Sequence, residues 1–222
     1  MGPVFIDLDR TLIDVNSAHS WLRHEWNAGR VGVVHALRAS MWFGLYALGK
    51  DGLAYALNEA AALYRDVPAS QIQQLTDAWF QRDIRSHLRP GAAAVLARHR
   101  EAGQRIILAT TSSQFVASCA QAEWGFDDVV CTMVGVDPTT GLLTGQIADS
   151  AYGRQKLRRC REWADAHDVD LKDCTFYTDS ASDLSLLREV GTPVVVHPDR
   201  RLLRIARAEG WPIQDWGTST TD

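Results

Sequence analysis

Short apolar runs alternate with helical patterns along most of this chain, and that alternation restricts the fold more than any other feature. The runs lie at residues 4–6, 106–109, 175–177 and 193–196, and their length and composition are typical of buried strands. Helical patterns occupy 91–102, 114–124, 154–167 and 183–190, and three of them are followed by a glycine, the usual stop signal. Strands that alternate with helices in this way predict an α/β fold with a doubly wound parallel sheet.

The segment 15–87 interrupts the alternation. It is rich in Ala, Leu and Trp, and its pattern predicts helices without a strand. We therefore expect residues 1–14 and 88–222 to form an α/β core, and 15–87 to form a helical cap domain inserted after the first strand. Within the core, the run from Asp137 to Gly141 predicts a hairpin turn flanked by short strands.

Charge and cysteine content narrow the class of protein. A formal net charge of −4 over 222 residues gives no polybasic surface, which argues against a nucleic-acid partner. The four cysteines lack metal-ligand spacing, and no secretory signal precedes the first strand, so we expect free thiols and a cytoplasmic location. The apolar stretch 31–48 barely approaches spanning length and carries Arg38, whose insertion costs about 2.5–3.5 kcal/mol. A transmembrane helix is therefore rejected, whereas peripheral membrane contact and the oligomeric state stay open.

Polar residues follow three of the predicted strands at the point where each strand ends. They are Asp7 and Asp9 after the first, Thr110, Thr111 and Ser112 after the second, and Asp179 and Asp183 after the third. The carboxyl ends of parallel strands meet at one edge of a sheet, and ligands bind beyond that edge. The sequence therefore predicts that carboxylates and hydroxyls from distant segments meet at one site.

The motif Asp-x-Asp-x-Thr that begins at Asp7 suits phosphoryl transfer. Cleavage of a phosphate monoester needs a nucleophile, a proton donor for the leaving oxygen and positive charge on the phosphoryl oxygens. Asp7 can attack phosphorus, and Asp9 can protonate the leaving alcohol and then activate water. Taken alone, two such carboxylates are more often helix caps than catalysts.

Three further elements supply the remaining chemistry. The hydroxyls of Thr110, Thr111 and Ser112 can donate to a phosphate oxygen, although such residues are usually N-caps. Lys156, at the head of a predicted helix, can neutralise a phosphoryl oxygen, although a lone lysine is usually solvated. Asp179 can ligate a metal with Asp183 behind it, and hard oxygen ligands beside phosphate favour Mg²⁺ over zinc.

The order of these elements resembles that of the haloacid dehalogenase (HAD) superfamily, specifically subfamily IB, the phosphoserine phosphatase-like branch with a helical cap. The resemblance covers residues 4–14 and roughly 88–216. It also rests on the runs Leu88 to Gly91, Val196 to Asp199 and Gly210 to Pro212.

The resemblance implies a role for each matching position. Asp7 is implied to be the nucleophile and a Mg²⁺ ligand, and Asp9 the general acid and base, with its backbone carbonyl on the metal. Asp179 is implied to bind Mg²⁺, and Asp183 to support the metal from behind. The resemblance also implies that Thr110 contacts phosphate and that Lys156 holds the charge.

Substrate choice is expected to lie in the cap. In phosphoserine phosphatases an acidic residue shortly after the first motif holds the substrate's amino group, whereas here Asn16 stands there and Asp14 is the nearest acid. We expect a phosphomonoester hydrolase acting on a small phosphorylated metabolite, phosphoserine-like or another alcohol phosphate. The alternatives are a lipid-phosphate phosphatase at a membrane surface, suggested by the apolar stripe within 31–48, a phosphotransferase, or a non-catalytic binding module.

Overall fold

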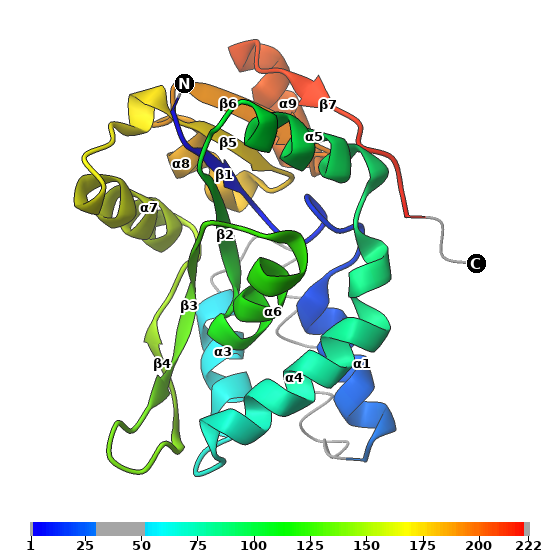
Figure 1. Ribbon diagram of the computed structural model, residues 1–222, viewed down its shortest axis with the longest axis vertical. Coiled ribbons are helices and arrows are strands. Elements are labelled where there is room, and N and C mark those ends of the chain that lie inside the picture. Colours follow the sequence, from blue (N-terminus) through cyan, green and yellow to red (C-terminus); the bar gives the residue numbers. More distant parts are fainter. Residues whose placement is uncertain (1, 30–51, 220–222) are drawn as a thin grey trace.

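The computed structural model describes residues 2–29 and 52–219, and the helices and strands named below all belong to these ranges. Within them, seven strands form one sheet in the order β4-β3-β2-β1-β5-β6-β7 (Figure 1). The strands are β1 (Val4–Ile6), β2 (Ile106–Ser113), β3 (Asp128–Val136), β4 (Leu143–Asp149), β5 (Thr175–Thr178), β6 (Thr192–Val196) and β7 (Ile213–Gln214). Neighbouring strands are parallel except β3 and β4, which form an antiparallel hairpin. The predicted α/β class and parallel sheet are confirmed.

The helices largely fall where the sequence places them. The α-helices are α1 (Ser17–Asn27), α3 (Gly52–Ala62), α4 (Ala69–Asp83), α5 (Pro90–Glu101), α6 (Gln114–Trp124), α7 (Arg154–Ala166), α8 (Leu184–Leu187) and α9 (Arg200–Glu209), and the 3₁₀ turns are η1 (Arg85–His87), η2 (Leu171–Asp173) and η3 (Ala181–Asp183). Helix α6 has the predicted bounds and ends at Gly125, whose left-handed φ of 63° a glycine adopts without strain.

Two expectations about individual elements were wrong. The helix expected over 183–190 is instead the 3₁₀ turn η3 followed by the four-residue α8. The Ser180 hydroxyl accepts the backbone N–H of Ser182, and such local bonds compete with a regular helix. The strands of the predicted hairpin are also not short, because β3 and β4 have nine and seven residues; the first part of β3, residues 128–132, pairs with β2, and the rest pairs with β4.

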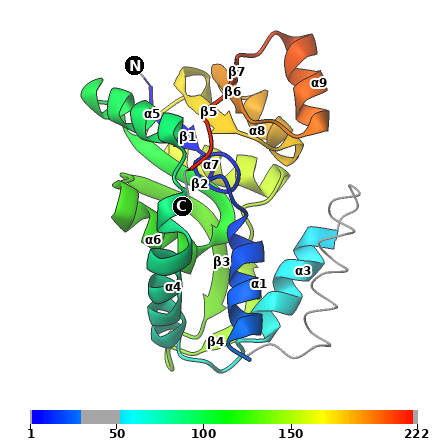
Figure 2. The ribbon, with the colours of Figure 1, turned by 90° about the vertical axis from the view of Figure 1, so that its right-hand side faces the viewer.

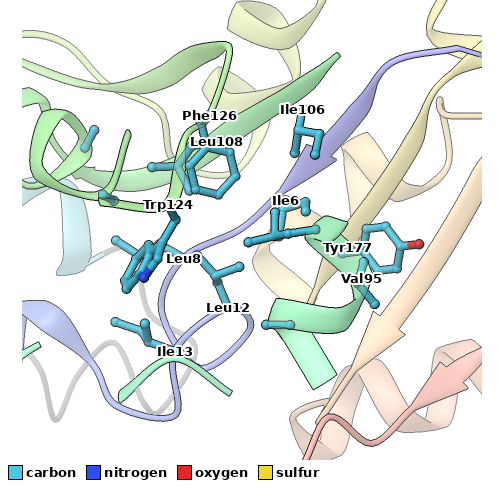
Figure 3. Packing of buried hydrophobic residues seen from close by; sticks show 14 of the residues in the cluster. Ile6, Leu8, Leu12, Ile13, Val95, Ile106, Leu108, Trp124, Phe126 and Tyr177 are labelled. Atoms are coloured by element: carbon cyan, nitrogen blue, oxygen red, sulfur yellow. The ribbon is translucent and has the colours of Figure 1, made fainter. Parts of the chain in front are cut away.

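Both faces of the sheet are buried, as expected for parallel strands. Successive residues of β1 point to opposite faces, so Ile6 packs on one side and Phe5 on the other. Helices α5 and α6 cover the Ile6 side, where the packing of the core is seen in Figure 3. Helices α7, α8 and α9 cover the Phe5 side. This packing on both faces holds the strands in place, and with them the edge of the sheet at which the predicted polar residues meet.

The described helices between β1 and α5 lie together at one end of the molecule, beside the β3–β4 hairpin (Figures 1 and 2). Helix α4 reaches into the sheet core, since Trp79 and Phe80 belong to the same buried cluster as Leu8. The loop before α4 also joins the hairpin, with the Asp66 N–H donating to the Leu143 carbonyl at 2.9 Å. The apolar stripe within 31–48 lies outside the described residues. In the described part of the chain, every helix is too short or too polar to cross a bilayer.

Candidate active site

A tight loop after β1 positions Asp7 and Asp9 at the carboxyl edge of the sheet. The Asp7 N–H donates to the Tyr177 carbonyl of β5 at 2.9 Å, so the residue is held between two central strands. The loop then turns back on itself, because the Ile13 N–H donates to the Leu8 carbonyl at 3.0 Å. Arg10 has a left-handed φ of 60° within this turn, a conformation that is costly for a residue other than glycine and is concentrated at functional sites.

Lys156 lies inside the protein rather than on its surface. Its side chain is 1% exposed, and its Nζ donates to Asp7 Oδ1 at 2.9 Å and to Asp183 Oδ2 at 2.8 Å. Burial opposes its charge, but the two carboxylates prevail and raise the pKa of Lys156 above its ordinary value. The solvated lysine considered from the sequence is therefore excluded, and the ammonium holds the carboxylates after β1 and β5 together.

The turn before α7 delivers Lys156 to this position. Gly153 caps α7 with φ 56° and ψ −122°, a combination that side chains of L-residues forbid. The Lys156 N–H closes the first helical turn on the Gly153 carbonyl at 3.1 Å. The position of Lys156 therefore depends on a backbone conformation at Gly153 that glycine adopts readily and other residues do not.

Asp179 faces the same point as Asp7. The Thr11 hydroxyl lies 3.3 Å from Asp179 Oδ1 and 3.5 Å from Asp7 Oδ2, so it bridges the two carboxylates. Thr178 supports the other acid by donating to Asp183 Oδ2 at 2.8 Å. The carboxyl groups after β1 and β5 therefore converge, as a shared cation would require.

Asp199 anchors the loop that carries Asp179. Its N–H donates to the Asp179 carbonyl at 2.9 Å, and its Oδ2 accepts the Ala181 N–H at 2.8 Å. The other carboxylate oxygen caps α9 by accepting the N–H groups of Arg201 and Leu202. Helix α9 thereby holds the position of the site loop.

The site concentrates negative charge. Asp7, Asp179 and Asp183 are 6%, 7% and 1% exposed, and one buried ammonium, that of Lys156, stands against them among the described residues. Burial raises the pKa of Asp7 to about 7, with the charges of Asp183 and Asp9 adding to the effect and that of Lys156 opposing it. Burial and the nearby Asp7 likewise raise the pKa of Asp179 well above its usual range. A cation bound beside these groups would favour their ionised forms.

The candidate ligands at this edge are of the kind that a hard cation such as Mg²⁺ prefers. Every candidate ligand at this edge is an oxygen, and Mg²⁺ uses one or two carboxylates while keeping several waters. In residues 2–29 and 52–219 no group of three or more His, Cys, Asp or Glu side chains has a metal-holding arrangement, which a structural zinc site would need. The four cysteines are buried and free.

Asp9 is held by two serines. Its Oδ1 accepts the Ser17 backbone N–H, and its Oδ2 accepts the hydroxyls of Ser17 at 3.0 Å and Ser112 at 2.9 Å. Burial raises the pKa of Asp9, and the bonds from the two serines oppose that rise. Ser112, expected to face a phosphate, is thus turned toward Asp9.

Thr110 and Thr111, the other two residues of β2 that were expected to contact phosphate, also have protein partners. The Thr110 side chain is fully buried and its oxygen accepts the Ser112 N–H at 3.0 Å, while Thr111 donates to the Ala151 carbonyl at 3.1 Å. The three predicted hydroxyls thus have protein partners in this structure, and their contact with phosphate stays a prediction.

The two candidates for binding a substrate amine are engaged elsewhere. Asn16 caps α1 by accepting the His19 N–H at 2.9 Å. Asp14 bonds His87 Nδ1 at 2.9 Å and accepts the Ser219 N–H at 2.6 Å, which ties the chain's C-terminal segment to this loop. The sequence offered no sign of these partners.

Four residues of the site were not singled out from the sequence. They are Thr11, Ser17, Thr178 and Asp199. Thr11, Thr178 and Asp199 lie inside or next to the motifs, so their positions gave a usable signal. Ser17 gave none beyond its place at a helix start, because its contact with Ser112 spans 95 residues.

Comparisons with known proteins agree with this geometry. The family model described as haloacid dehalogenase-like hydrolase matches residues 4–188. An "inhibition of morphological differentiation" protein of Streptomyces azureus is 31% identical over 96% of this chain and 77% of its own length. A phosphoserine phosphatase of Mycobacterium tuberculosis is 28% identical, covering 96% of this chain and 70% of its own. A histidinol-phosphatase of Neisseria meningitidis is 26% identical, covering 93% and 95%.

A solved structure is similar over nearly the whole chain. A Bordetella pertussis protein of unknown function superposes with a TM-score of 0.87 at 25% identity, and the match covers 96% of this chain and 98% of that one. The fold and its connectivity are therefore shared across the described core and the helices inserted after β1.

Proposed function

Because this chain belongs to the haloacid dehalogenase-like hydrolases, we propose that it is a Mg²⁺-dependent phosphomonoester hydrolase that works through an aspartyl-phosphate at Asp7. The observation that carries the proposal is the buried ammonium of Lys156, which bonds Asp7 and Asp183 at 2.9 and 2.8 Å. A nucleophilic carboxylate needs a fixed positive partner that stays in place as charge shifts to the phosphoryl group. The bridge that Thr11 makes to Asp179 adds support, because it brings the second proposed metal ligand to the same point.

The chemistry proceeds in two displacements. A carboxylate oxygen of Asp7 attacks phosphorus while the bond between phosphorus and the ester oxygen breaks, and Asp9 gives its proton to that leaving oxygen. Asp9, now a carboxylate, then takes a proton from a water whose oxygen attacks phosphorus. The bond between phosphorus and Asp7 breaks, inorganic phosphate leaves, and both aspartates return to their starting forms. The raised pKa of Asp9 favours the protonated form that the first displacement needs.

Residues 7, 9 and 179 would hold the metal. The carboxylates of Asp7 and Asp179 and the backbone carbonyl of Asp9 are the proposed ligands, with Asp183 supporting Lys156 and the loop. When bound, Mg²⁺ supplies positive charge against the phosphoryl oxygens. Thr110 and Thr111 stay proposed phosphate contacts that would have to exchange their present partners for substrate, whereas the Ser112 hydroxyl, also expected to contact phosphate, lies on Asp9.

A small alcohol phosphate is the proposed substrate class. The M. tuberculosis and N. meningitidis relatives are named for phosphoserine and histidinol phosphate, which are both monophosphates of amino alcohols. We extend that class to this chain, with residues 1–14 and 88–222 as catalytic core and 15–87 as substrate-selecting cap. No observation in the described residues favours lipid phosphates.

The test is hydrolysis of p-nitrophenyl phosphate and of a panel of phosphorylated metabolites by the purified protein. EDTA should stop the reaction and Mg²⁺ should restore it. Asp7→Asn should abolish turnover while the circular dichroism spectrum stays native. Asp165→Asn, at an exposed position of α7, should leave turnover unchanged. A fully active Asp7→Asn enzyme would refute the nucleophile. Oxygen-18 water should label the released phosphate, and label-free phosphate on an added alcohol would indicate a transferase instead.

A further inference from the structure

The carboxylate of Asp9 is clamped between two elements that are distant in sequence. One is the first turn of α1, where Ser17 offers both its backbone N–H and its hydroxyl. The other is the end of β2, where Ser112 offers its hydroxyl. Ser17 is 2% exposed, so protein groups rather than bulk water determine where this carboxylate points.

The hydrogen atoms available at this cluster can be counted. The two hydroxyl oxygens lie 3.0 Å from each other, and each is also within 3.0 Å of Asp9 Oδ2. Each hydroxyl has one hydrogen to give and two lone pairs to accept with. Either both serines donate to Oδ2, or one donates to the other, which donates to Oδ2. Oδ1, in contrast, faces a backbone N–H that can only donate.

This arrangement suits a group whose protonation must reverse during each turnover. When Asp9 is a carboxylate, the hydroxyls of Ser17 and Ser112 can donate to Oδ2. When Oδ2 carries a proton, one of the two hydroxyls can rotate and accept it, whereas the N–H keeps Oδ1 in place. The carboxyl group then has hydrogen-bond partners in both of its protonation states.

We propose that Ser17 and Ser112 are positioning residues for the proton transfer by Asp9. The proposal rests on the proposed function and adds a specific step to it. In the first displacement the Asp9 proton moves to the leaving oxygen as the phosphorus–oxygen bond breaks, and the serines turn from accepting to donating. In the second, Asp9 takes a proton from the attacking water and the serines turn back.

The leaving group provides the readout. A nitrophenolate leaves with little help from an acid, whereas an unsubstituted phenolate needs its proton, so loss of acid positioning should be selective. Ser17→Ala keeps the backbone N–H and removes the hydroxyl. We expect its kcat/KM, which reports the first displacement, to fall roughly tenfold on phenyl phosphate and less than about threefold on p-nitrophenyl phosphate.

Matched variants separate positioning from folding. Ser112→Ala should show the same selectivity, and the double variant should lose more than the sum of the single losses, since either hydroxyl can serve Oδ2 when the other is absent. Ser17→Thr retains the hydroxyl and should restore the phenyl phosphate rate. Ser118→Ala, on an exposed position of α6 away from Asp9, is the control. Melting temperatures check that each variant is folded.

The outcomes distinguish this inference from the function on which it depends. Folded Ser17→Ala and Ser112→Ala enzymes that lose kcat/KM equally on both esters, or lose none, would overturn the role of the serines. An inactive Asp7→Asn enzyme in the same experiment would leave the proposed function intact. If Ser17→Ala fails to fold, the result for the Ser112→Ala enzyme, changed at a half-buried position, tests the proposal by itself. A wild-type protein that hydrolyses neither ester, or an active Asp7→Asn, would instead remove the proposed function itself.

Discussion

Lys156 shows how far one buried charge can shape a site. An ammonium at 1% exposure is sustained by carboxylates on two sides, and each of those carboxylates depends on it in return. Removing one partner from such a network leaves an uncompensated buried charge, which is costlier than never having buried the network. The residue therefore couples stability to function.

Replacing Lys156 by methionine should be destabilising as well as inactivating. Asp7 and Asp183 would face each other without a cation, and we expect a loss of about 3–5 kcal/mol in the free energy of unfolding. Urea denaturation in EDTA at pH 8 measures it. Lys172→Met, at an exposed position, should change stability by less than about 0.5 kcal/mol. Equal stabilities for the two variants would contradict the ion-pair network.

The pKa of Asp7 predicts how pH governs metal binding. With that pKa raised to about 7, the carboxyl is mostly protonated below pH 7, so a metal must displace the proton. Each pH unit below 7 should weaken the apparent Mg²⁺ affinity by at least about tenfold, because Asp179, the other proposed carboxylate ligand, also has a raised pKa and can hold a second proton. The raised pKa of Asp7 also sets the direction in which pH changes the stability of the folded protein. A carboxyl with a raised pKa destabilises the metal-free protein as pH rises through 7, so the gain in Tm from Mg²⁺ should grow from pH 6 to pH 8. A gain that shrinks over this range would contradict the assignment.

At the scale of elements, the start of α7 is the most constrained turn that serves the site. Gly153 combines φ 56° with ψ −122°, and Lys156 follows in the first helical turn. Gly153→Ala should cost about 1–3 kcal/mol of stability and lower kcat, because relief of the strain moves the helix start and the lysine with it. Gly103→Ala is the control, since its φ of 67° is also left-handed, nothing lies within 4 Å of its added Cβ, and it follows α5 rather than a site loop. A similar loss of activity in both variants would show that the effect is only one of stability.

Across the whole molecule, helix α4 of the segment inserted after β1 packs against the core of the sheet. Trp79 of α4 is 1% exposed and lies in the same cluster as Ile6 and Leu108 of the sheet. Its indole meets Trp21 of α1 edge-on at 5.1 Å, which continues the packing into the first inserted helix. In the described residues, side-chain packing therefore continues across the proposed boundary at residue 87, which stays a prediction.

The chain should consequently unfold in one transition. Tryptophan fluorescence and far-ultraviolet circular dichroism should give coincident urea curves, and Trp79→Ala should lower the stability of the entire protein by about 3–5 kcal/mol. Trp26→Ala is the comparison, because that side chain is 45% exposed. Two separated transitions, or a Trp79→Ala effect confined to one probe, would mean that the inserted helices fold independently.

Local patterns in the amino-acid sequence were sufficient to predict the sheet, its flanking helices and the chemical groups at the strand ends. Apolar runs, glycine stops and the motif spacing are local signals, so β1 and α6 could be predicted with their bounds. The same locality explains why Asp7, Lys156 and Asp179 could be named in advance, since each stands next to such a signal.

The contacts that each polar group makes depend instead on how the elements pack together. The serine pair on Asp9, the Thr11 bridge and the use of Asp14 to hold Ser219 join residues far apart in the chain, and no local pattern encodes them. The exposure of Lys156 could not be predicted from the sequence either. The sequence pattern of a helix start is the same whether the helix faces solvent or a buried carboxylate. Periodicity reports which face of an element is apolar, whereas the partner of a polar side chain depends on how elements pack in three dimensions.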